Sequence, residues 1–366
     1  MMAILWLMQV APAATAADTT VRVTFGGFVD TYYAWDFGEP PTRDRSFAGG
    51  ALFTTQPARH NEFNVNLAFA EAKVEGDRVR GRVALQFGTS VVSNYSGEPA
   101  TGVVSGPSAS RYLQEAYAGW RAGRTVWIDG GIFYSHMGME GWVSRDNLTY
   151  TRSLVAEYSP YYQSGLRATW TPTPKLVTQL DVVNGWQNIS ESNSGKGAGV
   201  RLDYSPSPNA TLSYYNFFSD ESGNRLRAFN GVGARVGSGR VTIGGEFDAG
   251  SQRGSASDGG TAIWYGFAAV TKAQLSSRVA VTARVERFRD DDQVVVSTGV
   301  RADGTANPPL RSNGASIGVD VVPAPRLVWR TEMRGFGNHN AVFPDASSTV
   351  PTRGSGFVVT SLSLRI

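Results

Sequence analysis

Apolar and polar side chains alternate along most of this chain with a period of two residues. In "RVRGRVALQFGT", residues 78–89, the arginines Arg78, Arg80 and Arg82 share one parity, while Val83 and Leu85 take the other. A β-strand sends successive side chains to opposite faces. The segment therefore predicts a strand with one charged wall and one apolar wall.

The same two-faced pattern recurs in sixteen segments. They cover residues 21–36, 60–75, 78–92, 110–121, 125–134, 160–172, 175–186, 196–205, 209–219, 226–236, 240–250, 261–272, 278–289, 311–322, 326–337 and 355–366. Most are longer than the usual five or six residues of a globular strand, and they are long enough to cross a bilayer at a tilt.

The links between these segments alternate strictly between short and mostly long. "EGDR", "RAGR" and "TPTP" are short, whereas "GEPPTRDRSFAGGALFTTQPAR" is long. This asymmetry is typical of outer-membrane barrels, which have short periplasmic turns and long extracellular loops. The sequence therefore predicts an all-β fold, a closed antiparallel transmembrane β-barrel of about 16 strands with both termini on the turn side. A propeller would repeat a four-stranded unit, and no such repeat is present.

The barrel explains the arginines, because arginine facing lipid near mid-bilayer costs roughly 2 to 4 kcal/mol. We expect them to face a lumen too wide for side chains to fill, which would hold water. The pore-lining candidates are Arg22, Arg78, Arg80, Arg82, Arg284, Arg330 and Arg334. Inward acids balance the inward arginines, so we expect weak ion selectivity, with a transverse field from the arginines clustered at 78–82.

By the same parity rule, the apolar residues of "NEFNVNLAFA" should face lipid, and these are Phe63, Val65, Leu67 and Phe69. Tryptophans near strand ends predict two girdles at the membrane interfaces. Trp35, Trp186 and Trp264 lie near long loops, and Trp120, Trp127, Trp170 and Trp329 lie near short turns.

Composition adds little beyond the strand pattern. The 42 glycines and 11% aromatic residues suit strands and turns, cysteine is absent, and a net charge of +3 gives no reason to expect nucleic acid as a partner. The apolar start ends in Ala14-Thr15-Ala16, which fits a signal peptide over residues 1–16, followed by the barrel over 17–366. No Lys or Arg precedes the apolar run, so either the true start lies upstream or the stretch is an apolar tail.

Several stretches resemble the OmpL-like β-barrel porin family of Gram-negative bacteria. They include "FVDTYYAWDF", "HNEFNVNLAFAEA", "LQEAYAGW", "WIDGGIFYSHMGMEGWVSRDNLTYTRSL" and "VNGWQN", and they span most of residues 22–205. The resemblance implies an outer-membrane barrel that passes small solutes by passive diffusion. It supplies no active site.

The third long link, residues 135–160, follows the fifth predicted strand. In general porins with sixteen strands the loop at this position folds into the lumen, and by analogy we expect the same here. The constriction candidates are Glu140, Arg145, Asp146, Arg152 and Glu157. Charged side chains at a constriction select which ions pass. The alternative is an outward-facing surface loop.

Enzyme and metal motifs are weak. "GASIG", residues 314–318, fits the pattern of a hydrolase elbow, but it lies inside an alternating segment with no helix after it. His60, His136 and His339 lack the paired spacing of a zinc site, and the acidic run 290–292 lacks the ligand pattern of a calcium loop. We expect no enzyme activity, metal or cofactor.

The sequence thus predicts an outer-membrane porin whose partners are membrane lipid and small hydrophilic solutes or ions, with a homotrimer as the expected assembly. A substrate-specific channel, for instance for sugars, would need a row of aromatic residues down the lumen, and Tyr32, Tyr161 and Tyr215 are too scattered to establish one. A barrel enzyme and a closed structural or adhesion barrel remain as further alternatives.

Overall fold

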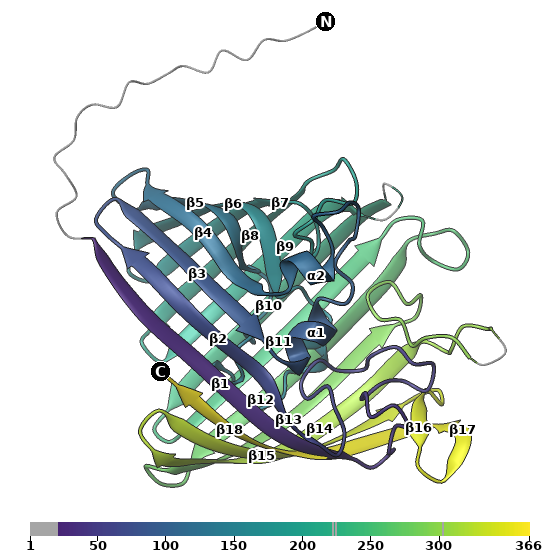
Figure 1. Ribbon diagram of the computed structural model, residues 1–366. Coiled ribbons are helices and arrows are strands. Elements are labelled where there is room, and N and C mark those ends of the chain that lie inside the picture. Colours follow the sequence, from purple (N-terminus) through teal and green to yellow (C-terminus); the bar gives the residue numbers. More distant parts are fainter. Residues whose placement is uncertain (1–20, 222, 224, 302–303) are drawn as a thin grey trace, which may run out of the picture.

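Sixteen strands form one closed antiparallel barrel (Figure 1) in the computed structural model, which describes residues 21–366 except 222, 224 and 302–303. The barrel strands are β1 (Arg22–Asp36), β2 (Phe63–Glu75), β3 (Val79–Phe87), β4 (Leu113–Arg121), β5 (Val126–Tyr134), β6 (Tyr162–Thr173), β7 (Leu176–Val183), β8 (Gly197–Ser207), β9 (Ala210–Glu221), β10 (Arg225–Ser238), β11 (Val241–Gln252), β12 (Ala262–Gln274), β13 (Val279–Asp290), β14 (Leu310–Ala324), β15 (Leu327–Asn338) and β18 (Gly354–Arg365). Each strand pairs with its neighbours in the chain, and β1 pairs with β18 to close the barrel.

The remaining elements lie in the long loops. They are α1 (Thr89–Asn94), α2 (Pro107–Ser110), a 3-10 turn (Ser144–Asp146), α3 (Leu154–Glu157) and the hairpin of β16 (Phe343–Asp345) and β17 (Ser348–Thr352). No helix among the described residues is long and apolar enough to cross a membrane. The expected signal peptide, residues 1–16, lies outside the described residues.

The predicted fold class is confirmed, and each predicted segment overlaps one barrel strand. The clearest difference in bounds is at β3, which ends at Phe87 although the predicted segment extends to residue 92. Gly88 takes a φ of 137°, and a Cβ there would lie 2.3 Å from the carbonyl oxygen of Asn66. Only glycine allows this close approach, and the chain leaves the barrel wall there to form α1.

The outward face of the barrel is apolar, as the parity of the sequence predicts. Val83, Leu85 and Phe87 are each more than half exposed on β3, whereas Ala84 and Gln86 between them are buried. Soluble proteins rarely expose an apolar surface this large, whereas the outer surface of a transmembrane barrel is apolar because it contacts lipid. We call the two rims the turn end and the loop end, after the short and long links that they carry.

The predicted lipid-facing parity is wrong for part of β2. The pairing with β1 shifts between Asp30 and Thr31, so that Asn66 forms a β-bulge. A bulge adds one residue to a strand and reverses the alternation beyond it. Phe63 therefore remains exposed to lipid, but Leu67 and Phe69 point inward and are buried.

The predicted tryptophan girdles are only partly correct. Trp120, Trp170 and Trp329 are about half exposed on the outward face, and they lie toward the turn end. Three others face inward instead: Trp127 lies under the guanidinium of Arg80, and Trp186 and Trp264 contact each other inside the barrel, as the ring and cation contacts show. The prediction used only how near each tryptophan lies to a strand end, and that does not tell on which face of the strand it lies. Trp127 and Trp264 share the parity of buried inward residues on their strands, Asp129 and Ala262.

The two rims should lie on opposite sides of the membrane. Val103 is fully exposed in the long link between β3 and β4, and Gly123 is exposed in the short turn between β4 and β5. We predict that Val103→Cys reacts with a membrane-impermeant maleimide on intact cells and that Gly123→Cys reacts only after lysis. Equal labelling of both variants on intact cells would contradict this topology.

The outward face should tolerate charge only near its edges. Val83 is the middle residue of β3 and Val79 is the first, and both side chains point outward. Val83→Arg should destabilise the barrel in lipid by roughly 2 to 4 kcal/mol, and Val79→Arg by about 0 to 1 kcal/mol, because the cost falls toward the interface. Urea unfolding in vesicles measures both, and equal effects would place Val83 outside the hydrocarbon region.

Candidate functional site

The link between β5 and β6, residues 135–161 and here called L3, lies inside the barrel. Its backbone and side chains contact strands around the whole wall. Ser144 donates to Asp30 on β1 at 2.8 Å, and the indole of Trp142 donates to Gln86 on β3 at 2.9 Å. On the other side, the amide of Met139 donates to Glu246 on β11 at 2.8 Å. L3 therefore crosses the lumen rather than facing outward.

A buried ionic network holds L3 against β13 and β15. Arg334 donates to both carboxylate oxygens of Glu286 at 2.9 Å, and Arg284 lies 3.1 Å from a carboxylate oxygen of Glu332. All four side chains are fully or almost fully buried. Buried charges are costly unless every group is paired and hydrogen-bonded, so this network requires further partners.

L3 supplies those partners. Arg284 donates to the side-chain hydroxyl and the carbonyl of Thr151, at 2.8 and 2.6 Å. The amide of Thr151 donates to Glu332 at 2.7 Å, and the amide of Leu154 donates to Glu286 at 2.7 Å. The conformation of L3 and the neutralisation of the network therefore depend on each other.

Arg330 on β15 binds the backbone of L3 directly. Its guanidinium donates to the carbonyl oxygens of Ser144, Asn147 and Thr149 at 2.7, 3.0 and 3.1 Å, and it lies 3.1 Å from Asp320. The expectation that Arg284, Arg330 and Arg334 line open water is thus wrong. They point inward, but L3 covers them and they act as its anchors.

The arginines near the turn end of β3 are paired rather than free. Arg80 forms two bonds with Asp129 on β5, at 2.7 and 2.6 Å, and Arg82 binds Glu71 at 2.7 Å and also contacts Glu115. These acids neutralise the charge within the same wall, so the expected transverse field is largely cancelled. Arg78 lies in the turn before β3 and Arg22 is exposed at the start of β1, so both lie at the turn-end mouth.

The five constriction candidates separate into two groups. Arg152 and Glu157 are buried where L3 meets the first long link: the Arg152 guanidinium lies 3.7 Å from the ring centre of Tyr161, and Glu157 accepts from the amide and hydroxyl of Thr55 at 3.0 and 2.8 Å. They do not face a channel. Sequence alone could not show this, because the partner Thr55 lies about one hundred residues away.

Glu140, Arg145 and Asp146 lie at the accessible side of L3. Asp146 forms two bonds of 2.8 Å with Arg365 near the turn end of β18, and Arg145 donates to the carbonyl of Arg326 in the turn before β15. L3 therefore reaches down to the turn-end mouth.

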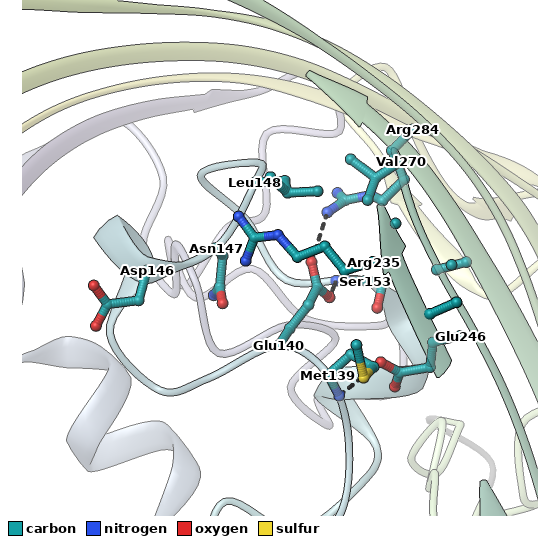
Figure 2. Close-up of a pocket in the computed structure, with 14 residues that line it drawn as sticks. Met139, Glu140, Asp146, Asn147, Leu148, Ser153, Arg235, Glu246, Val270 and Arg284 are labelled. Atoms are coloured by element: carbon teal, nitrogen blue, oxygen red, sulfur yellow. Dashed lines mark hydrogen bonds and ion pairs between the residues drawn. The ribbon is translucent and has the colours of Figure 1, made fainter. Parts of the chain in front are cut away.

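Glu140 borders a small recess of about 50 Å³ between L3 and the wall of β10 to β13 (Figure 2). It accepts from the amide of Ser153 at 2.6 Å, and its other carboxylate oxygen lies 3.9 Å from Arg284. Arg235 from β10 extends across the same recess. The carboxylates of Glu140, Asp146 and Glu246 and the guanidinium groups of Arg235 and Arg284 thus line this space. Among these five side chains, only Arg235 lacks a hydrogen-bond partner within the described chain.

The loop-end half of the lumen is packed, contrary to the expectation of a water-filled interior throughout. The first long link, residues 37–62, inserts Phe47 and Phe53 against Phe336 and Phe343. Burial raises the pKa of Tyr150 and of other L3 tyrosines well above the ordinary value. Side chains fill this wide barrel because the loops bring their own hydrophobic core inside.

The turn-end half is more open. A hollow of about 340 Å³ is lined there by charged and aromatic side chains, among them Lys73, Glu75, Arg80 and Trp127. The polar wall of β2 to β6 described above forms one side of this hollow. The accessible, charged part of the lumen therefore lies between L3 and the turn end.

The histidines and the acidic run have structural contacts. The His136 ring contacts Gln163 at 3.0 Å and the carbonyl of Asn216 at 2.8 Å. Asp290 accepts from three consecutive loop amides, whereas Asp291 pairs with Arg289 and Arg311. Among the described residues, no group of three or more His, Asp or Glu side chains is placed to hold a metal ion.

Comparison with known proteins agrees with this geometry. A family model described as "Putative beta-barrel porin-2, OmpL-like" matches residues 22–362. The chain belongs to this family. Family membership confirms the resemblance seen in the sequence, and it places the barrel in the bacterial outer membrane, with the loop end outside. No curated protein matches the sequence.

Solved outer-membrane proteins share the fold at low identity. An anion-selective porin from Comamonas acidovorans is 10% identical with a TM-score of 0.57, over 95% of this chain and 100% of that chain. OprB of Pseudomonas putida is 12% identical with a TM-score of 0.58, over 94% of both chains. OmpT of Vibrio cholerae in its trimer form is 7% identical with a TM-score of 0.57, over 94% and 99%. These matches show a common fold only.

The Arg330 anchor gives a test of how L3 is held. Arg330→Met removes three charge-assisted hydrogen bonds, each worth about 1.5 to 3 kcal/mol, from the loop backbone. We predict larger current fluctuations in planar bilayers and faster protease cleavage within L3. Arg240→Met, in an exposed turn, is the control. Currents and protease resistance equal to those of the control would show that Arg330 does not hold the loop.

Proposed function

We propose that this protein is a porin that passes small hydrophilic solutes or ions by passive diffusion, with L3 as its constriction. The observation that carries the proposal is the position of L3, which crosses the lumen and leaves beside it only a narrow recess lined by acidic and basic side chains. Membership of a porin family supports the same function. We also propose that residues 1–16 direct export.

The charges on the proposed path favour weak selectivity. Arg80 and Arg82 are paired with acids of the same wall, and Glu140 faces Arg284. Three carboxylates and two guanidinium groups line the recess, so passing ions would meet charges of both signs with no strong preference for either.

A closed structural barrel is the second candidate, because the loop-end half of the lumen is packed with aromatic and aliphatic side chains. A sugar-specific channel is less well supported, since the inward aromatic rings mostly contact one another inside this packing. The porin family and its porin-like neighbours favour a channel without enzymatic activity. By analogy with the trimeric neighbour, we propose a homotrimer.

Neutralising the acids of L3 tests the constriction. The double variant Glu140→Gln, Asp146→Asn removes negative charge from the recess and leaves Arg235 and Arg284 in place. In planar bilayers under a salt gradient, we predict a reversal potential shifted toward anion preference. The shift should shrink at higher ionic strength, because charges are screened over about 10 Å at 0.1 M salt.

The matched control is Glu39→Gln, Asp258→Asn, which removes two exposed charges from the long loops. It should leave selectivity nearly unchanged. A measurable conductance with no shift in the L3 variant would mean that the path lies elsewhere, and no conductance from the wild-type protein would favour the closed barrel.

A further inference from the structure

Three arginines on β13 and β14 point away from the lumen at the loop end. On β13, Glu286 and Phe288 are buried inside, whereas Arg287 is exposed and Arg289 is half-buried on the opposite parity. Arg311 pairs with Arg289 across the two strands and shares its face. These three residues, here called the rim patch, therefore face the membrane and not the proposed channel.

The rim patch carries excess positive charge. Asp291 bridges two of its members, at 2.5 Å from Arg289 and 2.5 Å from Arg311. Arg287 has neither an ion-pair nor a hydrogen-bond partner within the part of the chain that the structure describes. One carboxylate among three guanidinium groups leaves about two positive charges on a surface that meets the membrane edge.

The surface at the rim patch is hollowed. A depression of about 390 Å³ is lined by the three arginines together with Asn313, Gly337 and His339. Gly337 on β15 presents no side chain, and a Cβ there would meet no atom within 4 Å. A polar group of several atoms can therefore approach the guanidinium groups from outside the barrel.

Directly below the rim patch, the same outward rows become apolar. Toward the middle of the membrane, the outward-facing residues are apolar and exposed. They are Val285 next to Arg287 on β13, Ile317 further along β14 from Arg311, and Met333 on β15. The patch thus marks the level where hydrocarbon gives way to headgroups at the loop end, which is the extracellular side. Guanidinium groups at this level lie close enough to anionic headgroups to be attracted by their charge, and arginine binds phosphate oxygens in a bidentate geometry.

We propose that the rim patch binds the phosphate group of an outer-leaflet lipid, with its acyl chains lying along the apolar rows of β13 to β15. Two observations select a lipid over a dissolved anion: the patch faces away from the lumen, and it continues into an apolar surface. Arg287 would be the central contact, because its charge is uncompensated. The proposal rests on the outer-membrane barrel alone and is independent of channel function.

Native mass spectrometry of the refolded full chain, titrated with diphosphoryl lipid A, tests the proposal. We expect saturable binding by the wild type, and binding weakened roughly tenfold for each guanidinium group that is removed, first in Arg287→Gln and then in Arg287→Gln, Arg311→Gln. Phosphatidylethanolamine, a zwitterionic lipid, should bind weakly to all variants. The control Arg240→Gln, Arg278→Gln removes the same charge from exposed positions at the turn end and should bind like the wild type.

Three results would overturn the proposal. The first is equal lipid A binding by the rim-patch and control variants, with both shown to be folded by heat-modifiable migration in gels. The second is full displacement of lipid A by inorganic phosphate, which would indicate a site for a free anion. The third is a changed subunit number in the rim-patch variant alone, which would make this face a contact between copies of the chain.

Discussion

The buried network of Arg284, Glu286, Glu332 and Arg334 is the interaction on which the arrangement of the lumen depends. Charges removed from water must find complete hydrogen bonding, or they destabilise the structure by several kcal/mol. The barrel wall alone leaves several of these hydrogen bonds unmade, and L3 supplies most of them through Thr151 and the amide of Leu154. The loop is therefore part of the electrostatic balance of the wall and is held in place by it.

This coupling divides the inside of the barrel into two environments. On the loop side of L3, the long links carry hydrophobic residues inward, and aromatic rings pack as they would in the core of a soluble protein. On the turn side, paired charges such as Arg80 and Asp129 line a hollow. The proposed channel would run through the charged turn side of the lumen and past L3 at Glu140.

The outer surface is divided in a similar way, because its middle contacts lipid hydrocarbon and its loop end contacts headgroups. Apolar rows cover the middle of the barrel, and arginines appear where the loop end of β13 and β14 begins. A charge that would be costly at mid-bilayer can be favourable a few ångströms further out, because lipid headgroups there carry opposite charge. The same residue type therefore anchors a loop on one face of β13, at Arg284, and meets the membrane edge on the other, at Arg287.

Alternation with a period of two was enough to predict the sixteen barrel strands, their short turns and long loops, and the inward parity of Arg80, Arg82, Arg284, Arg330 and Arg334. These features depend only on local backbone geometry and on the contrast between lipid and water. The bulge at Asn66, which turns Leu67 and Phe69 inward, arises from pairing with β1 and leaves no mark on the pattern of β2. The burial of Arg152 and Glu157, and the conversion of three arginines from pore lining to loop anchors, were likewise decided by the tertiary structure. Their partners are distant in sequence, and which charges pair is fixed only when L3 and the wall are brought together.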